Sequence, residues 1–150
     1  LLAGVSLGHD VKYATPEGME PNREVISRAE KIAKETGAKI TATNDPIEAV
    51  SDAGVVYTDI FVSMGEEHIK NKFAAFDGFQ VNEELVSNAK DNYLFMHCLP
   101  AHRGEEVTDA VIDSKNSIVF DQAENRMWAQ MAILTYLCNP AAFDAYNELY

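Results

Sequence analysis

Cysteine is scarce in this chain, because only two of its 150 residues are cysteines, Cys98 and Cys138. Two cysteines cannot build a disulfide framework, and neither lies in a CxxC motif or in a Cys/His cluster with the spacing of metal ligands. We therefore expect two reduced thiols and no metal site.

Basic residues are also few, since 12 Lys and Arg stand against 24 Asp and Glu and leave a net charge of -12. A chain of this sign repels a phosphate backbone. We therefore expect no nucleic acid partner.

Long apolar runs are missing as well. No stretch approaches the roughly 20 apolar residues that cross a bilayer, and no basic segment at the amino end leads into an apolar signal core. We therefore expect a cytoplasmic protein without membrane contact. The chain opens without Met on an apolar run that Gly8 ends like the tail of a helix, so we expect the natural polypeptide to begin earlier.

Nucleotide-binding signatures are absent too, because Gly4 and Gly8 do not complete GxGxxG and no GxxxxGK[ST] occurs. What is present is an alternation of strand and helix signals, with a size that suits one core and one domain, 1–150. Strands are expected at 10–16, 39–43, 54–59, 93–99 and 117–120, and helices at 22–37, 45–53, 69–76, 83–89, 109–112 and 126–137.

Such alternation is typical of parallel strands joined by helical crossovers. We therefore predict the α/β class, with a doubly wound, Rossmann-like parallel sheet. Residues 54–59 are apolar enough for burial on both faces. Within the last helix, Met127, Met131, Leu134 and Cys138 fall on one stripe, which we expect to pack in the core.

Ligands of doubly wound sheets bind at the carboxyl ends of the strands, and two of these ends carry unusual side chains. Asp59 follows an apolar strand, where it could hold an ammonium group, orient a nucleophile or cap the next turn. Cys98 could be a reactive thiol or a small buried side chain. His102 and Arg103 could line a pocket or face water.

Arg126 opens the last predicted helix, at the positive end of the helix dipole. A cation at that place is favourable only if it meets an anion. That anion could be a ligand, or it could be Glu124 or Asp121 in a surface ion pair.

Three motifs occur in order along the chain: Ser63-Met64-Gly65 shortly after Asp59, His97-Cys98-Leu99-Pro100, and Glu124-Asn125-Arg126. Together they resemble the second, ornithine-binding domain of ornithine carbamoyltransferases, within the aspartate/ornithine carbamoyltransferase family. The resemblance spans essentially the whole chain. In aspartate-specific relatives Pro typically replaces the cysteine, and the Ser-Met-Gly loop differs.

The resemblance implies transfer of a carbamoyl group from carbamoyl phosphate to the δ-amine of L-ornithine, giving citrulline and phosphate without a metal or organic cofactor. It implies that Asp59, Ser63 and Met64 hold ornithine, the last two on a loop that closes over it. It also implies that Cys98 is the candidate proton acceptor beside that amine.

For the other substrate, the resemblance implies that Cys98, Leu99 and Arg126 meet carbamoyl phosphate, whose carbonyl oxygen gains negative charge during attack. The alternatives are transfer to another amine, such as putrescine or an acylated ornithine, and a non-catalytic amino-acid-binding module. Ser63-Met64-Gly65 favours plain ornithine.

Several parts of the family pattern do not occur in this chain. The Ser-Thr-Arg-Thr-Arg loop and the His-Pro-x-Gln segment belong to an amino-terminal carbamoyl-phosphate domain, and the first strand of the second domain is also missing. We therefore expect a gap in the sheet, a need for the missing domain, and no activity of the chain alone. The resemblance further implies a homotrimer for the full-length enzyme.

Overall fold

The computed structural model describes residues 1–62 and 72–147. Its helices are α1 (Leu2–Ser6), α2 (Arg23–Thr36), α3 (Pro46–Val50), α4 (Lys72–Ala75), α5 (Glu83–Val86), α6 (Asp109–Ile112), α7 (Val119–Cys138) and α8 (Pro140–Asn147), and its strands are β1 (Val11–Ala14), β2 (Ile40–Thr43), β3 (Val55–Thr58) and β4 (Leu94–His97). None of the helices in the described part of the chain combines the length and apolarity that crossing a bilayer requires.

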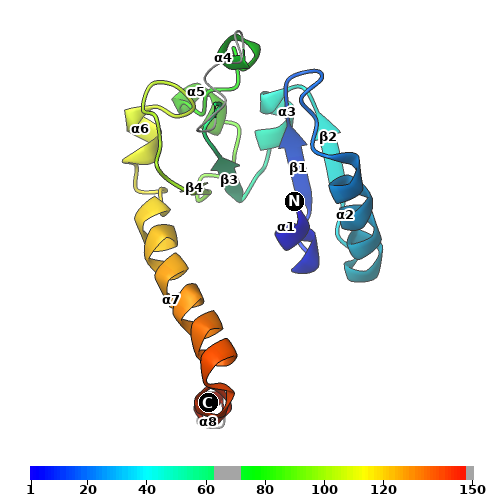
Figure 1. Cartoon of the computed structure of the whole chain (residues 1–150). Coiled ribbons are helices and arrows are strands. Elements are labelled where there is room, and N and C mark those ends of the chain that lie inside the picture. Colours follow the sequence, from blue (N-terminus) through cyan, green and yellow to red (C-terminus); the bar gives the residue numbers. More distant parts are fainter. Residues whose placement is uncertain (63–71, 148–150) are drawn as a thin grey trace.

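The strands form two separate parallel pairs, β1 with β2 and β3 with β4 (Figure 1). The α/β class with parallel strands is thereby confirmed, and the expected gap in the sheet lies between β1 and β3. A cavity of about 460 Å³ lies there, lined by residues of both strands and of α3.

Burial of β3 on both faces was a wrong prediction, and the gap is the reason. Val56 is buried, but Val55 and Tyr57 remain 53% and 54% exposed and line the cavity. Their face of the strand is apolar, and no other element of the described chain covers it.

Helix α2 begins and ends at the capping residues that the sequence predicts. Asn22 accepts a hydrogen bond from the Glu24 N–H at 2.8 Å, which satisfies one of the free donors of the first turn. Gly37 ends the helix at φ 80°, a left-handed conformation that glycine adopts without a Cβ clash. The buried Ala29 and Ala33 turn inward and anchor the helix to the first half of the chain.

Two hydrophobic clusters take the place of the single expected core. A small one gathers Val5, Ala29 and Ala33 beside β1 and β2. A larger one fills the second half of the chain and comprises Val50, Val56, Val81, Leu85, Val86, Tyr93, Phe95, Val107, Val111, Ile112 and Val119. The two clusters are separate because the sheet is interrupted between β1 and β3, and a continuous sheet would join them.

The strand expected at 117–120 is wrong. Phe95 donates its N–H to Asn116 O at 2.8 Å and accepts the Ile118 N–H at 3.0 Å, so strand-like pairing lasts for one bridge only. Val119 already begins α7, seven residues before the predicted start of that helix. The segment that follows is rich in helix formers, which favour helix over a longer strand.

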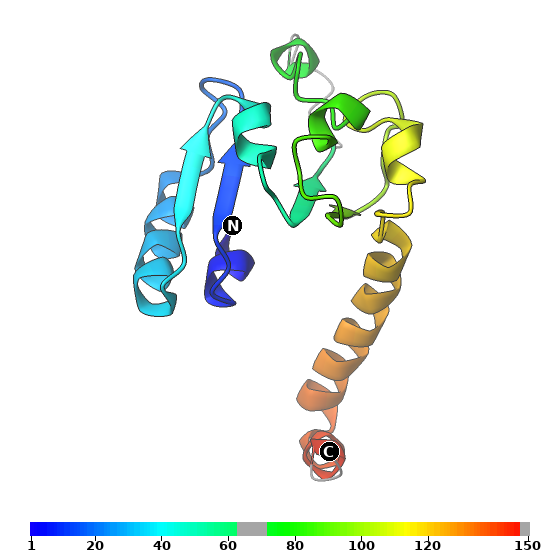
Figure 2. The same ribbon diagram turned by 180° about the vertical axis from the view of Figure 1, so that it is seen from behind.

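The apolar stripe of α7 is also not core packing. Met127, Met131 and Leu134 are 50%, 51% and 59% exposed, and Cys138 is exposed as well. Figures 1 and 2 show the reason, since α7 extends away from both sheets and carries α8 at its far end. Helix α8 was not predicted.

Candidate functional site

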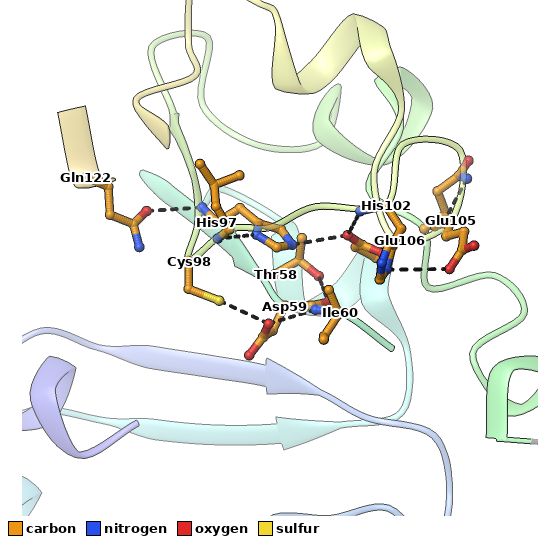
Figure 3. A network of polar contacts seen from close by, with 11 residues as sticks. Thr58, Asp59, Ile60, His97, Cys98, His102, Glu105, Glu106 and Gln122 are labelled. Carbon is orange, nitrogen blue, oxygen red and sulfur yellow. Dashed lines mark hydrogen bonds and ion pairs between the residues drawn. The ribbon is translucent and has the colours of Figure 1, made fainter. Parts of the chain in front are cut away.

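Two predicted residues meet at the carboxyl ends of β3 and β4. Thr58 and His97 are partners in the parallel register, so the residues that follow them, Asp59 and Cys98, emerge side by side. The Cys98 thiol donates a hydrogen bond to Asp59 Oδ1 at 3.0 Å (Figure 3). Asp59 Oδ1 also accepts the Ile60 N–H at 2.8 Å, so this carboxylate caps a turn and contacts the thiol at once.

The environment keeps this thiol protonated at neutral pH. Burial raises the pKa of Cys98, and both the hydrogen bond to Asp59 and the charge of that carboxylate raise it further. Burial likewise raises the pKa of the neighbouring Tyr57 phenol. In this state Cys98 is therefore a hydrogen-bond donor, and Asp59 is the anion of the site.

Gln122, in the first turns of α7, forms hydrogen bonds to both β3 and β4. Gln122 accepts the His97 N–H at 3.1 Å and donates to the Tyr57 hydroxyl at 3.2 Å. The role of this amide could not be predicted from the sequence, because its two partners lie 25 and 65 residues away along the chain.

The prediction that Arg126 opens the last helix is wrong, because α7 begins at Val119 and Arg126 lies inside it. It follows Gln122 by four residues, which puts both on one helix face, with Arg126 one turn further along the helix. The guanidinium is exposed, and no ion pair with Glu124 or Asp121 occurs within the described residues. Its charge is thus available to an anion.

The chain reverses after Cys98 in an unusual backbone conformation. Leu99 has φ 53°, in the left-handed region, and a cis peptide bond joins it to Pro100. Its N–H is donated to His97 Nδ1 at 2.9 Å. The Leu99 N–H is thereby paired inside the chain and is not available to a ligand.

A buried pair of ionisable side chains lies behind this segment. His97 and Glu106 are both 0% exposed, and His97 Nε2 lies 3.2 Å from Glu106 Oε1 (Figure 3). Glu106 Oε1 also accepts the His102 N–H at 2.6 Å. Strand alternation places His97 on the same inward face as Tyr93 and Phe95 and so could have indicated its burial.

Ser63 and Met64, the expected ornithine contacts, lie outside the described residues. The chain on either side is held together by aromatic rings, since Phe61 stacks on Phe76 with centroids 4.5 Å apart and meets Phe73 edge to face at 6.1 Å. Phe61 is only two residues from Asp59. This cluster therefore packs Phe61 against Phe73 and Phe76 close to Asp59.

His102 and Arg103 have structural partners. Arg103 forms charge-assisted hydrogen bonds to Asp109 at 2.7 Å and to Asp113 at 2.5 Å, and the second of these lowers the pKa of Asp113. Donor atoms of His102, Glu105 and Glu106 lie within 4.8 Å of one another, close enough to surround a cation. His102 and Glu105 are half-exposed, and exposed acidic groups commonly gather without an ion, so the cluster assigns no metal.

Comparisons with known proteins agree with this geometry. A family model described as "Aspartate/ornithine carbamoyltransferase, Asp/Orn binding domain" matches residues 1–137. The chain belongs to the aspartate/ornithine carbamoyltransferase family. The matched range includes all the candidate site residues described above, from Asp59 to Arg126.

Close relatives within this family bear the name ornithine carbamoyltransferase. The catabolic enzyme of Thermoplasma acidophilum is 56% identical over 135 residues, which are 89% of this chain and 44% of the relative. The anabolic enzyme of Pyrococcus furiosus is 54% identical over 144 residues, 95% of this chain and 46% of the relative.

A solved structure of ornithine carbamoyltransferase from Pyrococcus furiosus superposes with a TM-score of 0.84 at 57% identity, covering 89% of this chain and 43% of that one. The Rossmann-like fold class is confirmed by this likeness. The chain spans less than half the length of the relatives it matches.

Proposed function

We propose that this chain is the ornithine-binding domain, 1–150, of an enzyme that transfers a carbamoyl group from carbamoyl phosphate to the δ-amine of L-ornithine. The observation that carries the proposal is the Asp59–Cys98 contact of 3.0 Å at the ends of adjacent parallel strands. The names of the relatives support ornithine as the acceptor.

The chemistry explains why an anion and a thiol are useful together. An alkyl ammonium has a pKa of about 10.4, so it must lose a proton before its nitrogen can attack. The Asp59 carboxylate suits the ammonium as a counter-ion. Cys98 can accept that proton only as the thiolate, so its own thiol proton must first leave to water, which a substrate ammonium beside Asp59 would favour by offsetting the charge of the carboxylate. A thiolate whose conjugate acid has a raised pKa is then a better proton acceptor for the ammonium.

After proton loss the free amine attacks the carbonyl carbon of carbamoyl phosphate. The new C–N bond forms, the bond from this carbon to the phosphate oxygen breaks, and phosphate leaves with the bonding electrons and takes up the second proton that the attacking nitrogen gives up. The carbonyl oxygen becomes more negative on the way, and the exposed Arg126 guanidinium is the cation proposed to meet it. No cofactor is needed, because the donor carries its own leaving group.

Four further contacts complete the proposed site. The carbonyl oxygens of Cys98 and Leu99 accept N–H groups of the amine or of the carbamoyl group, while Ser63 and Met64 hold ornithine. Closure of their loop would exclude water, which would otherwise compete with the amine for the carbamoyl donor.

We further propose that additional polypeptide completes the enzyme. Two surfaces support this: the cavity between β1 and β3, and α7, where seven large apolar side chains from Met127 to Leu137 are at least half exposed. The missing first strand of this domain would fill the gap, and an amino-terminal carbamoyl-phosphate domain would cover α7, within a homotrimer. The two free cysteines suit the reducing cytoplasm as its location.

The test is carbamoyl transfer by the full gene product that contains this chain. Carbamoyl phosphate is supplied with L-ornithine and, in parallel, with putrescine, N-acetylornithine or aspartate, and the carbamoylated products are quantified. Transfer confined to ornithine is the expected outcome. Transfer to another acceptor would replace ornithine in the proposal, and no transfer to any of them would favour an amino-acid-binding module.

A further inference from the structure

Two ionisable side chains, His97 and Glu106, are completely buried in the described ranges 1–62 and 72–147, and the transfer chemistry above uses neither of them. Burial of a charged or polar group is unfavourable unless it is paired. The contacts of these two residues lead directly to the backbone of the candidate site. Their place in the fold therefore suggests a task beyond packing.

The hydrogen bonds define the state of the His97 ring. Nδ1 accepts the Leu99 N–H at 2.9 Å, so this nitrogen carries no hydrogen, and the ring proton resides on Nε2. Nε2 faces the Glu106 carboxylate at 3.2 Å (Figure 3). This contact is not a well-aligned hydrogen bond, and the carboxylate acts mainly through its charge, which favours a proton on the facing nitrogen.

The bond to Leu99 controls a strained part of the chain. A leucine at φ 53° persists only where surrounding contacts hold it. In a trans peptide the N–H and the preceding C=O point in opposite directions. With the Leu99 N–H turned inward to the ring, the Cys98 carbonyl is turned away from His97.

We propose that His97 and Glu106 are positioning residues for the transfer. Glu106 selects the tautomer of His97 with Nδ1 as the acceptor, and Nδ1 holds the Cys98–Leu99 peptide in the orientation that brings the thiol to Asp59. The proposal rests on the function proposed above, since it states how the residues of that site are kept in place.

Two substitutions of His97 separate the acceptor from the rest of the ring. In His97→Asn, the amide oxygen stands two bonds from Cβ, as Nδ1 does, and can still accept the Leu99 N–H. In His97→Gln, the amide group stands three bonds from Cβ, as Nε2 does, and can meet Glu106 but leaves Leu99 without its acceptor. Val111→Ala, in the same core cluster, controls for loss of packing.

Steady-state kinetics of the full gene product provide the first measurement. We expect kcat of His97→Gln to fall by about 100-fold, the effect of misplacing a reacting group by about 1 Å, with a smaller change in KM for ornithine. His97→Asn should stay within about tenfold of the parent, and Val111→Ala should lower Tm without a comparable loss of kcat.

The role of Glu106 is tested by a double-mutant cycle. Glu106→Gln retains an oxygen for the His102 N–H but removes the charge that selects the tautomer, so it should lower kcat by about tenfold in the parent. In the His97→Asn background it should have no further effect, because asparagine has no tautomer to select. Additive losses would contradict the proposed link between the two residues.

A second measurement does not depend on activity. The rate of Cys98 alkylation by iodoacetamide is followed against pH by mass spectrometry of the peptide that contains it. Asp59 and Tyr57 are the titratable groups that influence the thiol. His97→Gln should move the alkylation midpoint to lower pH, because the thiol loses its contact with Asp59, whereas His97→Asn should not.

These results distinguish the two proposals. A parent enzyme without transfer activity would overturn the proposed function, while the alkylation profiles would still decide whether His97 positions Cys98. Equal loss in His97→Asn and His97→Gln, or a loss of kcat that Val111→Ala reproduces at the same fall in Tm, would overturn the positioning role.

Discussion

At the scale of single residues, the contact between Asp59 and Cys98 governs the protonation of the site. The carboxylate raises the pKa of the thiol through its hydrogen bond and its charge, in addition to the effect of burial. A substrate ammonium entering beside Asp59 would offset that charge and make the thiolate easier to form. Under the proposed function, Cys98 would therefore ionise more readily with substrate bound than in the free site.

The first prediction concerns this ionisation. Asp59→Asn removes a negative charge that opposes formation of the thiolate, so the pKa of Cys98 should fall, and the midpoint of its alkylation profile should move to lower pH. Ser51→Ala, a change at an exposed residue elsewhere in the chain, serves as the control. An unchanged midpoint in Asp59→Asn would show that burial alone sets the pKa of the thiol.

The second prediction concerns Arg126. Its side chain is exposed, so Arg126→Ala should change the free energy of unfolding by less than about 0.5 kcal/mol. Loss of a cation that meets the developing charge should lower kcat of the full gene product by about 100-fold. Arg28→Ala, at an exposed position of α2, should leave kcat unchanged. Equal activity of the two variants would remove Arg126 from the site.

Part of this site could be predicted from the sequence and part could not. Asp59 and Cys98 each end an apolar strand, so the rule for parallel sheets brings them to one edge. Glu106 and Gln122 follow no such rule, because each acts through a partner in another element. Only the folded chain shows that their polar atoms meet His97 and Tyr57.

At the scale of elements, α2 shows how local signals specify a helix. Asn22→Ala removes the acceptor of the Glu24 N–H and should lower the free energy of unfolding by about 1 kcal/mol. Asn22→Asp retains an acceptor and should lower it by much less. Urea denaturation measures both variants, and equal stability of Asn22→Ala and the parent would contradict the capping role.

Helix α7 shows where local signals are insufficient. Its start was misplaced because Ile118, Val119 and Phe120 favour strands individually, whereas the helix formers that follow and the single bridge to Phe95 favour helix. Its apolar stripe has the spacing of a core helix, and spacing alone cannot reveal which surface covers it. The sequence predicted that α7 exists as a helix but not its surroundings.

A prediction for α7 follows from this exposure. In the isolated chain, Leu134→Gln should change the free energy of unfolding by less than about 0.5 kcal/mol, because the side chain is 59% exposed. In the full gene product the same substitution should cost about 2 kcal/mol, since the proposed partner domain would bury that leucine. Similar costs in both proteins would show that nothing covers α7.

At the scale of the whole molecule, the chain consists of two packed halves that lack continuous sheet pairing. Each half has its own hydrophobic cluster, and the cavity of about 460 Å³ lies between the facing edges of β1 and β3. Unpaired strand edges and a long helix with exposed apolar side chains are features that proteins usually cover. Together with the partial coverage of its relatives, they support the proposal that the chain works within a larger enzyme.

The central claim is that this chain supplies the ornithine half of a carbamoyltransferase and depends on a second half. The most direct test is citrulline formation from carbamoyl phosphate and L-ornithine, measured for the isolated chain and for the full gene product at equal molar concentration. We predict citrulline from the full gene product and none from the isolated chain. Citrulline production by the 150-residue chain alone, at a rate comparable to that of the full gene product, would contradict the account.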